Sequence, residues 1–175
     1  MEVTPTDSQA PNPDVSYESM RMLDPAVRSV WMIKYALFTL VVTLIVGGYE
    51  ITQLFSSNDR FLPVGSYTGL VIAVGALISL LIPFLRYKYW RYELLDEELY
   101  LERGILNRVR TVVPLRRIQH LDVSQDILER EFDLGKLIVH TAGTRSADVV
   151  LPGLAYDEAE QFRDELRNYI TEDAL

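Results

Sequence analysis

The sequence has no cysteine, which excludes disulfide bonds, thiolate metal sites and cysteine nucleophiles. Histidine is almost absent as well, with only His120 and His140 among 175 residues. These histidines lie twenty positions apart in strand-like surroundings, and no third ligand accompanies them. The residues therefore predict no metal site, and they suggest no other cofactor.

Basic residues are also in deficit. The 17 lysines and arginines stand against 25 aspartates and glutamates, which gives a formal net charge of -8. A nucleic-acid partner would favour the opposite excess, because phosphates attract lysine and arginine. The acidic residues are distributed along the chain and indicate a solvated acidic surface. We expect no nucleic-acid partner.

Charged side chains are missing from a long segment near the N-terminus. The sequence YALFTLVVTLIVGGY, from Tyr35 to Tyr49, is uncharged, and the apolar run continues N-terminally past Lys34. A lysine near a helix end can extend its ammonium group to the lipid headgroups. The segment thus reaches the roughly 20 residues needed to cross about 30 Å of hydrocarbon. It predicts a transmembrane helix at about 30–50.

A second uncharged segment lies between Arg60 and Arg86 and contains GLVIAVGALISLLIPFL. It predicts a second transmembrane helix at about 64–85, within a membrane hairpin of residues 29–86. Since no Asp, Glu, His or Arg lies at the middle of either span, neither a proton relay nor an ion pathway has a candidate residue.

The connection from Glu50 to Pro63 is too short to hold a domain, so the two helices are expected to be antiparallel neighbours. Basic residues flank the outer ends of the hairpin: Arg21, Arg28, Lys34, Arg86, Lys88 and Arg91. This bias predicts a multi-pass protein of the cell membrane with both termini in the cytoplasm. Residues 1–28, which lack apolar periodicity and any signal-peptide pattern, are expected to form a disordered cytoplasmic tail.

Small residues recur every four positions at Gly65, Gly69 and Ala73. This spacing lets two helix backbones approach closely. The series is either the seam of a dimer or the face that packs within the hairpin, where Gly47 and Gly48 offer a matching groove.

Basic and aromatic residues interleave from Arg86 to Tyr92, in the sequence RYKYWRY. The pattern fits both an interfacial belt and, through its period of two, the start of a strand. Further strand patterns recur every eight to twelve residues, as in an antiparallel sheet that curls into a barrel or sandwich. The strand patterns cover Tyr89–Leu94, Leu99–Arg103, Val109–Val113, Ile118–Val123, Lys136–Thr141 and Asp148–Leu151.

Two helical patterns interrupt the strands of this predicted domain, which covers residues 87–171. Ile127, Leu128 and Phe132 suit a short helix, capped by Ser124 or Asp126. The second pattern begins with the pairing of Asp157 and Glu160 and ends near Ile170. Its apolar stripe consists of Ala159, Phe162, Leu166 and Tyr169. We expect this stripe to cover an open end of the barrel.

The run PLRRIQHLDVSQDILEREFDLGKLIVHTAG, followed by ADVVLPGL and a terminal amphipathic helix, resembles the bacterial and archaeal PH-like membrane proteins of the YdbS type, also called bPH2. The resemblance covers about Val30 to Ile170. Its most specific residues are Pro114, Arg117, Ile118, Gln119, Leu128, Arg130, Phe132, Leu134, Gly135, Thr141, Ala142 and Gly143. Where the family usually has Phe-Gly-Leu, this chain has Asp133. If that glycine serves a positive φ, aspartate is one of few tolerable replacements.

The resemblance implies a two-helix transmembrane hairpin followed by a mainly β PH-like barrel, seven-strand-like, capped by a C-terminal α-helix. Elsewhere this fold serves as a binding platform for phosphoinositides or peptides. It does not imply an activity.

Four arginines without an acidic neighbour occur between Gly104 and Leu121, although acidic residues dominate the domain. They are Arg108, Arg110, Arg116 and Arg117. Tethered close to the bilayer, they could bind anionic headgroups or a partner, and each cation near the surface contributes about 1 kcal/mol. The alternative is that they are solvated strand residues paired across the sheet with Asp122, Glu102 or Glu129.

No pattern in the sequence supports catalysis. Ser124, His140 and Asp148 are the residue types of a triad, but no nucleophile elbow accompanies them. We therefore expect no enzyme. The first hypothesis is a membrane-anchored PH-like interaction module that binds a protein partner or anionic headgroups at the cytoplasmic face. The second is a structural subunit of a larger membrane assembly with further PH-like copies, or a homo-oligomer.

Overall fold

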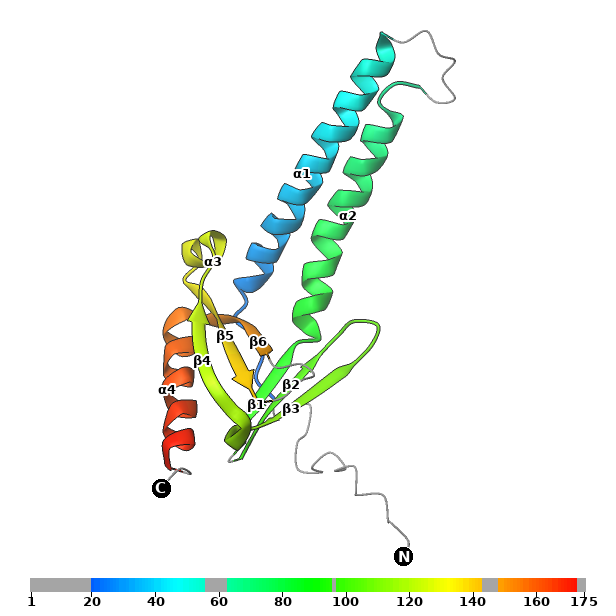
Figure 1. Cartoon of the computed structure of the whole chain (residues 1–175). Helices are drawn as coiled ribbons and strands as arrows, with labels where there is room; N and C mark the ends of the chain where they lie inside the picture. Colours follow the sequence, from blue (N-terminus) through cyan, green and yellow to red (C-terminus); the bar gives the residue numbers. More distant parts are fainter. Residues whose placement is uncertain (1–19, 56–62, 96, 143–147, 173–175) are drawn as a thin grey trace, which may run out of the picture.

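Two long helices and a β domain of six strands make up the described part of the chain (Figure 1). The structure is a computed structural model that describes residues 20–55, 63–95, 97–142 and 148–172. The helices are α1 (Val27–Leu54), α2 (Ser66–Lys88), α3 (Ile127–Glu131) and α4 (Tyr156–Glu172), and η1 (Leu115–Arg117) is a short 3-10 helix. The strands are β1 (Arg91–Leu94), β2 (Glu98–Arg103), β3 (Val109–Pro114), β4 (Ile118–Ser124), β5 (Leu134–Thr141) and β6 (Asp148–Ala155). Residues 1–19 of the expected tail, residues 56–62 of the helix connection and Gly143 lie outside the described residues.

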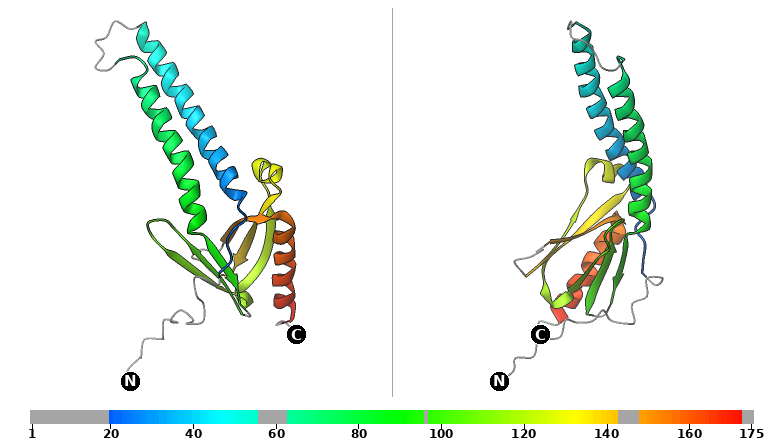
Figure 2. Two further views of the ribbon diagram at one scale, coloured as in Figure 1. Left: turned by 180° about the vertical axis from the view of Figure 1, so that it is seen from behind. Right: turned by 90° about the vertical axis from the view of Figure 1, so that its right-hand side faces the viewer.

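The two predicted transmembrane helices are present, and they lie side by side as an antiparallel pair (Figures 1 and 2). Both are long and apolar enough to cross a membrane. At 1.5 Å per residue the 28 residues of α1 extend about 42 Å, so this helix is longer than the hydrocarbon core. Exposed large apolar side chains cover both helices: Leu37, Phe38, Leu40, Leu44, Ile45, Leu70, Ile72, Leu77 and Leu80. Such a surface suits hydrocarbon, in which apolar side chains need no protein cover.

Gly47, one of the small residues singled out in the sequence, lies near Thr68 of α2, but the closest helix contact is made by small residues that were not singled out. Gly75 and Ser79 are buried on α2, and a Cβ at Gly75 would collide with the side chain of Thr39. In contrast, a Cβ at Gly69 or Gly48 would meet no atom within 4 Å. The interpretation of the Gly65, Gly69 and Ala73 series as the packing face within the hairpin therefore does not hold at Gly69.

The β domain consists of two three-stranded antiparallel sheets, with strand orders β1-β2-β3 and β4-β5-β6. The core lies between the sheets and α4, and its most deeply buried side chains include Leu99, Leu137 and Leu151. All six strands begin within two residues of the predicted positions, because alternating patterns locate strands well. The described strands are six, against the seven-strand-like barrel that the resemblance implies.

Helix α4 covers the second sheet with the predicted apolar stripe (Figure 1). Ala159, Phe162 and Leu166 are buried, whereas Tyr169 is exposed. The ring of Phe162 meets the ring of Tyr92 in β1 edge-on, with 6.0 Å between centroids, so α4 also contacts the first sheet. The helix begins at Tyr156, which puts the predicted cap, Asp157, in its first turn.

The turn around α3 agrees with two details of the sequence. Asp126, one of the two predicted caps, accepts a hydrogen bond from the Glu129 backbone N–H at 2.9 Å, and the Glu129 carboxylate accepts one from the Asp126 N–H at 2.9 Å. Asp133 has a φ of 51° and is the sole non-glycine residue with positive φ in the described part of the chain. The aspartate thus holds the left-handed conformation inferred for the family's glycine.

The segment before α1 belongs to the β domain. Arg21 pairs with Tyr92 of β1 through two backbone hydrogen bonds of 2.8 and 3.0 Å, and the Asp24 N–H donates to the Gly153 carbonyl at 2.8 Å. Leu23 is buried with 2% of its surface exposed. The structure therefore differs from the expectation of a disordered tail through residue 28, because Leu23 and its neighbours supply apolar side chains to the core.

The contact between this segment and β6 is close. Gly153 has a φ of 66°, and a Cβ there would lie 2.6 Å from Cγ2 of Val27, the first residue of α1. Val27, Val30 and Trp31 are part of the domain's buried core. The domain is consequently fixed to α1 as well as to α2, which continues into β1 through the short connection at Tyr89 and Trp90.

Candidate membrane-facing surface

At the ends of the helix pair that join the β domain, cations stack on aromatic rings. We call residues 27–34 of α1 and 85–90 at the end of α2 the helix base. The guanidinium of Arg86 lies 4.4 Å from the ring centre of Trp31, and that of Arg28 lies 4.8 Å from the ring centre of Tyr87. These cation–π pairs link the two helices in the mixture of aromatic and basic groups found at membrane interfaces.

The interleaved RYKYWRY sequence fits both structures expected of it, an interfacial belt and the start of a strand. Arg86 and Tyr87 are still helical and belong to the helix base, whereas Arg91 and Tyr92 open β1. The belt and the first strand are therefore consecutive parts of one segment.

The loop between β2 and β3, residues 104–108, lies beside the helix base (Figures 1 and 2). Strand β1 runs away from α2, and β2 returns antiparallel to it, with Glu102 opposite Arg91 at the start of β1. At the end of β2 the guanidinium of Arg103 lies 6.0 Å from the ring centre of Trp90. The loop continues past this point in the direction of α2.

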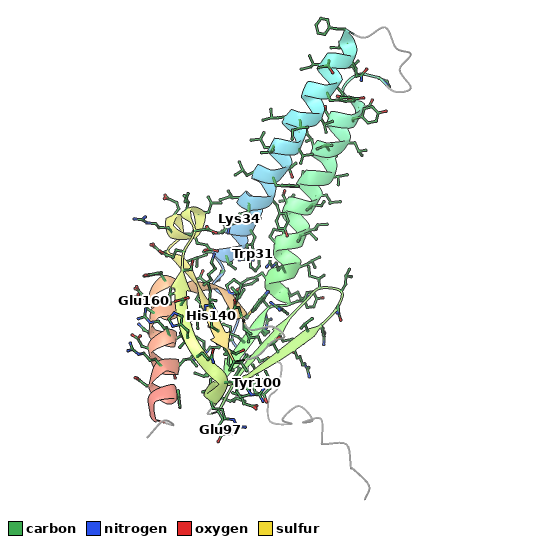
Figure 3. The ribbon with its side chains drawn as sticks, viewed as in Figure 1. Trp31, Lys34, Glu97, Tyr100, His140 and Glu160 are labelled. Carbon is green, nitrogen blue, oxygen red and sulfur yellow. The ribbon has the colours of Figure 1, made fainter. Side chains whose placement is uncertain are left out.

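On the other side of the helix pair, α3 is bound to α1 by ion pairs. Nζ of Lys34 lies 2.5 Å from Oδ2 of Asp126 and 3.4 Å from Oε1 of Glu129. The Glu129 side chain is nearly buried, and Nζ of Lys136 lies 3.4 Å from its Oε2. Figure 3 shows Lys34 on the side of α1 that faces α3, one turn above Trp31. Burial opposes ionisation of Asp126, but the hydrogen bonds from Lys34 and the Glu129 N–H outweigh it and lower the pKa of this carboxyl.

The four candidate arginines form two groups rather than one cluster. Arg108 lies in the β2–β3 loop and Arg110 on β3, where its Nε is 3.2 Å from Oε2 of the buried Glu102. Arg116 and Arg117 lie on η1, at the other end of β3 and away from the helices (Figure 1). All four are exposed. The six residues of β3 separate the two groups by about 20 Å.

The two histidines, which the sequence alone did not bring together, are cross-strand partners. His120 of β4 lies opposite His140 of β5, with 5.8 Å between ring centroids. Nδ1 of His140 lies 2.6 Å from Asp148 and its Nε2 lies 3.1 Å from Asp122. The hydrogen bond with Asp148 is the main cause that raises the pKa of His140. No group of three or more potential metal ligands occurs among the described residues.

The register also separates the residues of the conceivable triad. Ser124 lies opposite Lys136, four positions along β5 from His140. At about 3.3 Å per residue the distance along the strand is about 13 Å, which is far outside hydrogen-bond reach. Ser124 and His140 thus do not form a nucleophile and base pair.

Comparison with known proteins agrees with this architecture. The family model for the bacterial PH domain matches residues 35–170. The transmembrane protein YdbS of Bacillus subtilis (strain 168) is 28% identical over 145 residues, which cover 82% of this chain and 88% of YdbS. The transmembrane protein YdbT of the same organism is 28% identical over 96 residues, which cover 53% of this chain and 20% of YdbT. No solved structure matches. Because the family model spans well over half of the chain, helix pair included, this chain is a member of the bacterial PH domain family of membrane proteins.

Proposed function

We propose that the chain is a membrane-anchored PH-like interaction module that binds anionic lipid headgroups at the cytoplasmic face of the cell membrane. One observation carries the proposal: the β domain is attached to both helices, through Arg21 and Leu23 before α1 and through β1 after α2. A domain attached in this way presents one fixed face to the bilayer, and that face includes the β2–β3 loop with Arg108.

The orientation is supported by the charges at the two ends of the helix pair. The helix base has Arg28, Lys34, Arg86 and Lys88. In contrast, residues 50–70 at the other end include one basic residue, Arg60. An excess of cations is typical of the cytoplasmic side, so we assign the β domain and both termini to the cytoplasm.

Because the four arginines lie in two separate groups, we expect only the group near the helices to act on lipid. A cation close to an anionic leaflet contributes about 1 kcal/mol, and the effect decays within a Debye length of about 10 Å. Arg108 is beside the helix base, and Arg110 follows it with part of its charge offset by Glu102. Arg116 and Arg117 lie beyond the other end of β3, about 20 Å away. We therefore expect Arg108 and Arg110 to bind headgroups and the other pair to contribute little.

The test uses the full chain in lipid nanodiscs that contain spin-labelled phosphatidylglycerol or phosphatidylcholine. The wild type should show a preference for phosphatidylglycerol in its bound-lipid spectrum, and this preference should fall with added salt. Arg108→Gln with Arg110→Gln should abolish most of the preference, and the charge-matched control, Arg116→Gln with Arg117→Gln, should retain it.

Two further results decide between explanations. Since Arg110→Gln leaves the buried Glu102 without its partner, Arg108→Gln alone is measured as well, and it should lose about half of the effect. An equal preference in all four proteins would contradict headgroup binding by Arg108 and Arg110.

A second candidate is a structural subunit of a larger membrane assembly that contains further PH-like copies. Its support is the similarity to YdbT, of which this chain covers only a fifth. Arg116 and Arg117, exposed on η1, would then be available to an acidic protein partner. Purification of the full chain in mild detergent tests this candidate. A stoichiometric membrane-protein partner, released by Arg116→Gln with Arg117→Gln, would support it, and a chain that purifies alone would contradict it.

A further inference from the structure

Two apolar side chains protrude from the β domain without cover from the protein. Ile127, at the start of α3, has 89% of its surface exposed, and Leu106, in the β2–β3 loop, is fully exposed at 101%. The domain has a well-buried core elsewhere, with Leu137 and Leu151 completely inaccessible. A single exposed apolar residue needs no explanation by itself, but each of these two lies at the end of the domain that joins the helices, whose own exposed side chains are apolar.

The depth of α3 follows from its ion pairs with α1. The uncharged part of α1, residues 35–49, extends only about 22 Å at 1.5 Å per residue. The hydrocarbon core is about 30 Å thick, and Lys34 is the first charged residue N-terminal to this part, so Lys34 lies near the boundary of the core. Asp126 and Glu129 are bound to Lys34, and α3 therefore lies at this boundary.

The depth of the β2–β3 loop follows from its position beside α2. The uncharged part of α2 ends at Arg86, which stacks on Trp31, so the interface on this side passes near that pair. Arg103 at the end of β2 already contacts Trp90, and the loop extends further toward the helix. Figures 1 and 2 show the loop and α3 flanking the helix base on opposite sides.

The shape of the loop depends on a glycine. Gly104 has a φ of 118°, and a Cβ at this position would collide with the carbonyl oxygen of Asn107. Leu106 lies in the middle of this tight turn, between the paired residues Arg103 and Val109. A side chain held there has no neighbour within the chain to pack against, which fits a role in contact with lipid.

We infer that α3 and the β2–β3 loop insert Ile127 and Leu106 into the headgroup–acyl boundary of the leaflet that α1 and α2 enter, one on each side of the helix base. The occupant of this apolar surface is the bilayer itself, because the surface continues the lipid-facing surface of the helices. The exposed Glu131, at the end of α3, limits insertion to the headgroup–acyl boundary, and the other charged residues nearby do not oppose it. Asp126 and Glu129 are neutralised by Lys34 and Lys136, and Arg108 and Arg130 are long enough to reach headgroup phosphates.

The inference rests on the domain facing the leaflet, as the proposed function does, but it does not depend on lipid charge. The two insertions and the helix pair would make three points of attachment. Three points fix the plane of the domain relative to the membrane, so the domain cannot pivot about the helix ends.

The absence of cysteine gives a direct test. Single variants Leu106→Cys and Ile127→Cys of the full chain are labelled with an environment-sensitive fluorophore in nanodiscs of neutral phosphatidylcholine. The matched control is Glu97→Cys, because Glu97 is exposed at the end of the domain away from the helices (Figure 3). We expect labels at 106 and 127 to emit at shorter wavelength, to be quenched by nitroxide lipids, and to be several-fold less accessible to aqueous iodide than the label at 97.

The outcomes separate this inference from the proposed function. Iodide accessibility at either 106 or 127 equal to that at 97 would overturn the inference, whatever the arginine variants do. Protection at both sites in neutral lipid would support it even if Arg108→Gln and Arg110→Gln leave the lipid preference unchanged, in which case headgroup binding alone has failed. Unchanged circular dichroism of each labelled variant controls for misfolding.

Discussion

The helix pair exposes its large apolar side chains, whereas the β domain buries most of its own. In the helices the large apolar residues point outward, with Leu44 exposing 66% of its surface, and the buried residues include the small Gly75 and Ser79. In the domain Leu99 and Leu137 are fully buried, and charged residues cover the surface. Water drives apolar residues inward, whereas hydrocarbon leaves close backbone packing as the main force between helices.

The boundary between the two regions lies within α1 and not at its beginning. Val27, Val30 and Trp31 are helical, yet they are buried in the core of the β domain. The first turns of α1 are thus stabilised as part of the β domain, whereas residues 35–49, none of which is buried, form the outward-facing apolar part of the helix. A rigid junction of this kind is what a domain needs in order to present one face to the membrane.

The largest effect is expected when two chemically identical substitutions are made in the two regions. Leu23→Ala should destabilise the β domain by about 3 kcal/mol, because it removes a buried side chain and leaves a cavity. Leu44→Ala should change domain stability by less than about 0.5 kcal/mol, since Leu44 faces outward from the helix pair. Denaturant unfolding of the reconstituted chain, followed by the circular dichroism of the strands, measures both.

Leu137→Ala serves as the internal standard for this comparison, because its side chain is completely buried between the sheets. If Leu23→Ala resembles Leu44→Ala and not Leu137→Ala, the segment before α1 is not part of the domain, and the idea of a rigid junction fails.

A smaller effect is expected at the contact between α3 and α1. Asp126→Ala removes both the helix cap and the ion pair with Lys34 and should cost about 1–2 kcal/mol. Asp126→Asn keeps a capping oxygen and loses only the charge, so its cost should stay near 0.5 kcal/mol for these half-exposed partners. Amide hydrogen exchange of residues 127–131 compares the two variants. Equal exchange in both would mean that the cap contributes nothing.

The sequence was sufficient for features that depend on local patterns. The uncharged runs located both membrane helices, and period-two alternation located the six strands. Asp126, one of the two candidate caps, and the positive φ of Asp133 also follow from residues close in the chain. These features need no knowledge of the tertiary structure.

Features that depend on which strands pair, and in which register, could not be predicted from local sequence patterns. Nothing in the residues around Arg21 indicates a backbone pairing with Tyr92, 71 positions later. The four arginines looked like one cluster because a sequence does not reveal that β3 separates them, with one pair near the helices and the other away from them. His120 and His140 likewise become neighbours only through the antiparallel pairing of β4 with β5.

The histidine pair gives the smallest predicted effect, confined to the surface of the β domain. His140 lies between Asp148 of β6 and Asp122 of β4, and these carboxylates hold its pKa above the ordinary value of about 6.5. A raised pKa in the folded state means that the stabilisation is complete below about pH 6.5 and disappears as the pH rises through the folded value. Unfolding measured from about pH 6 to about pH 9 should therefore show a loss of stability in the wild type that His140→Gln lacks. The helix pair has no histidine, so the same titration should leave its hydrogen exchange unchanged; a matching change in both regions would assign the effect to another group.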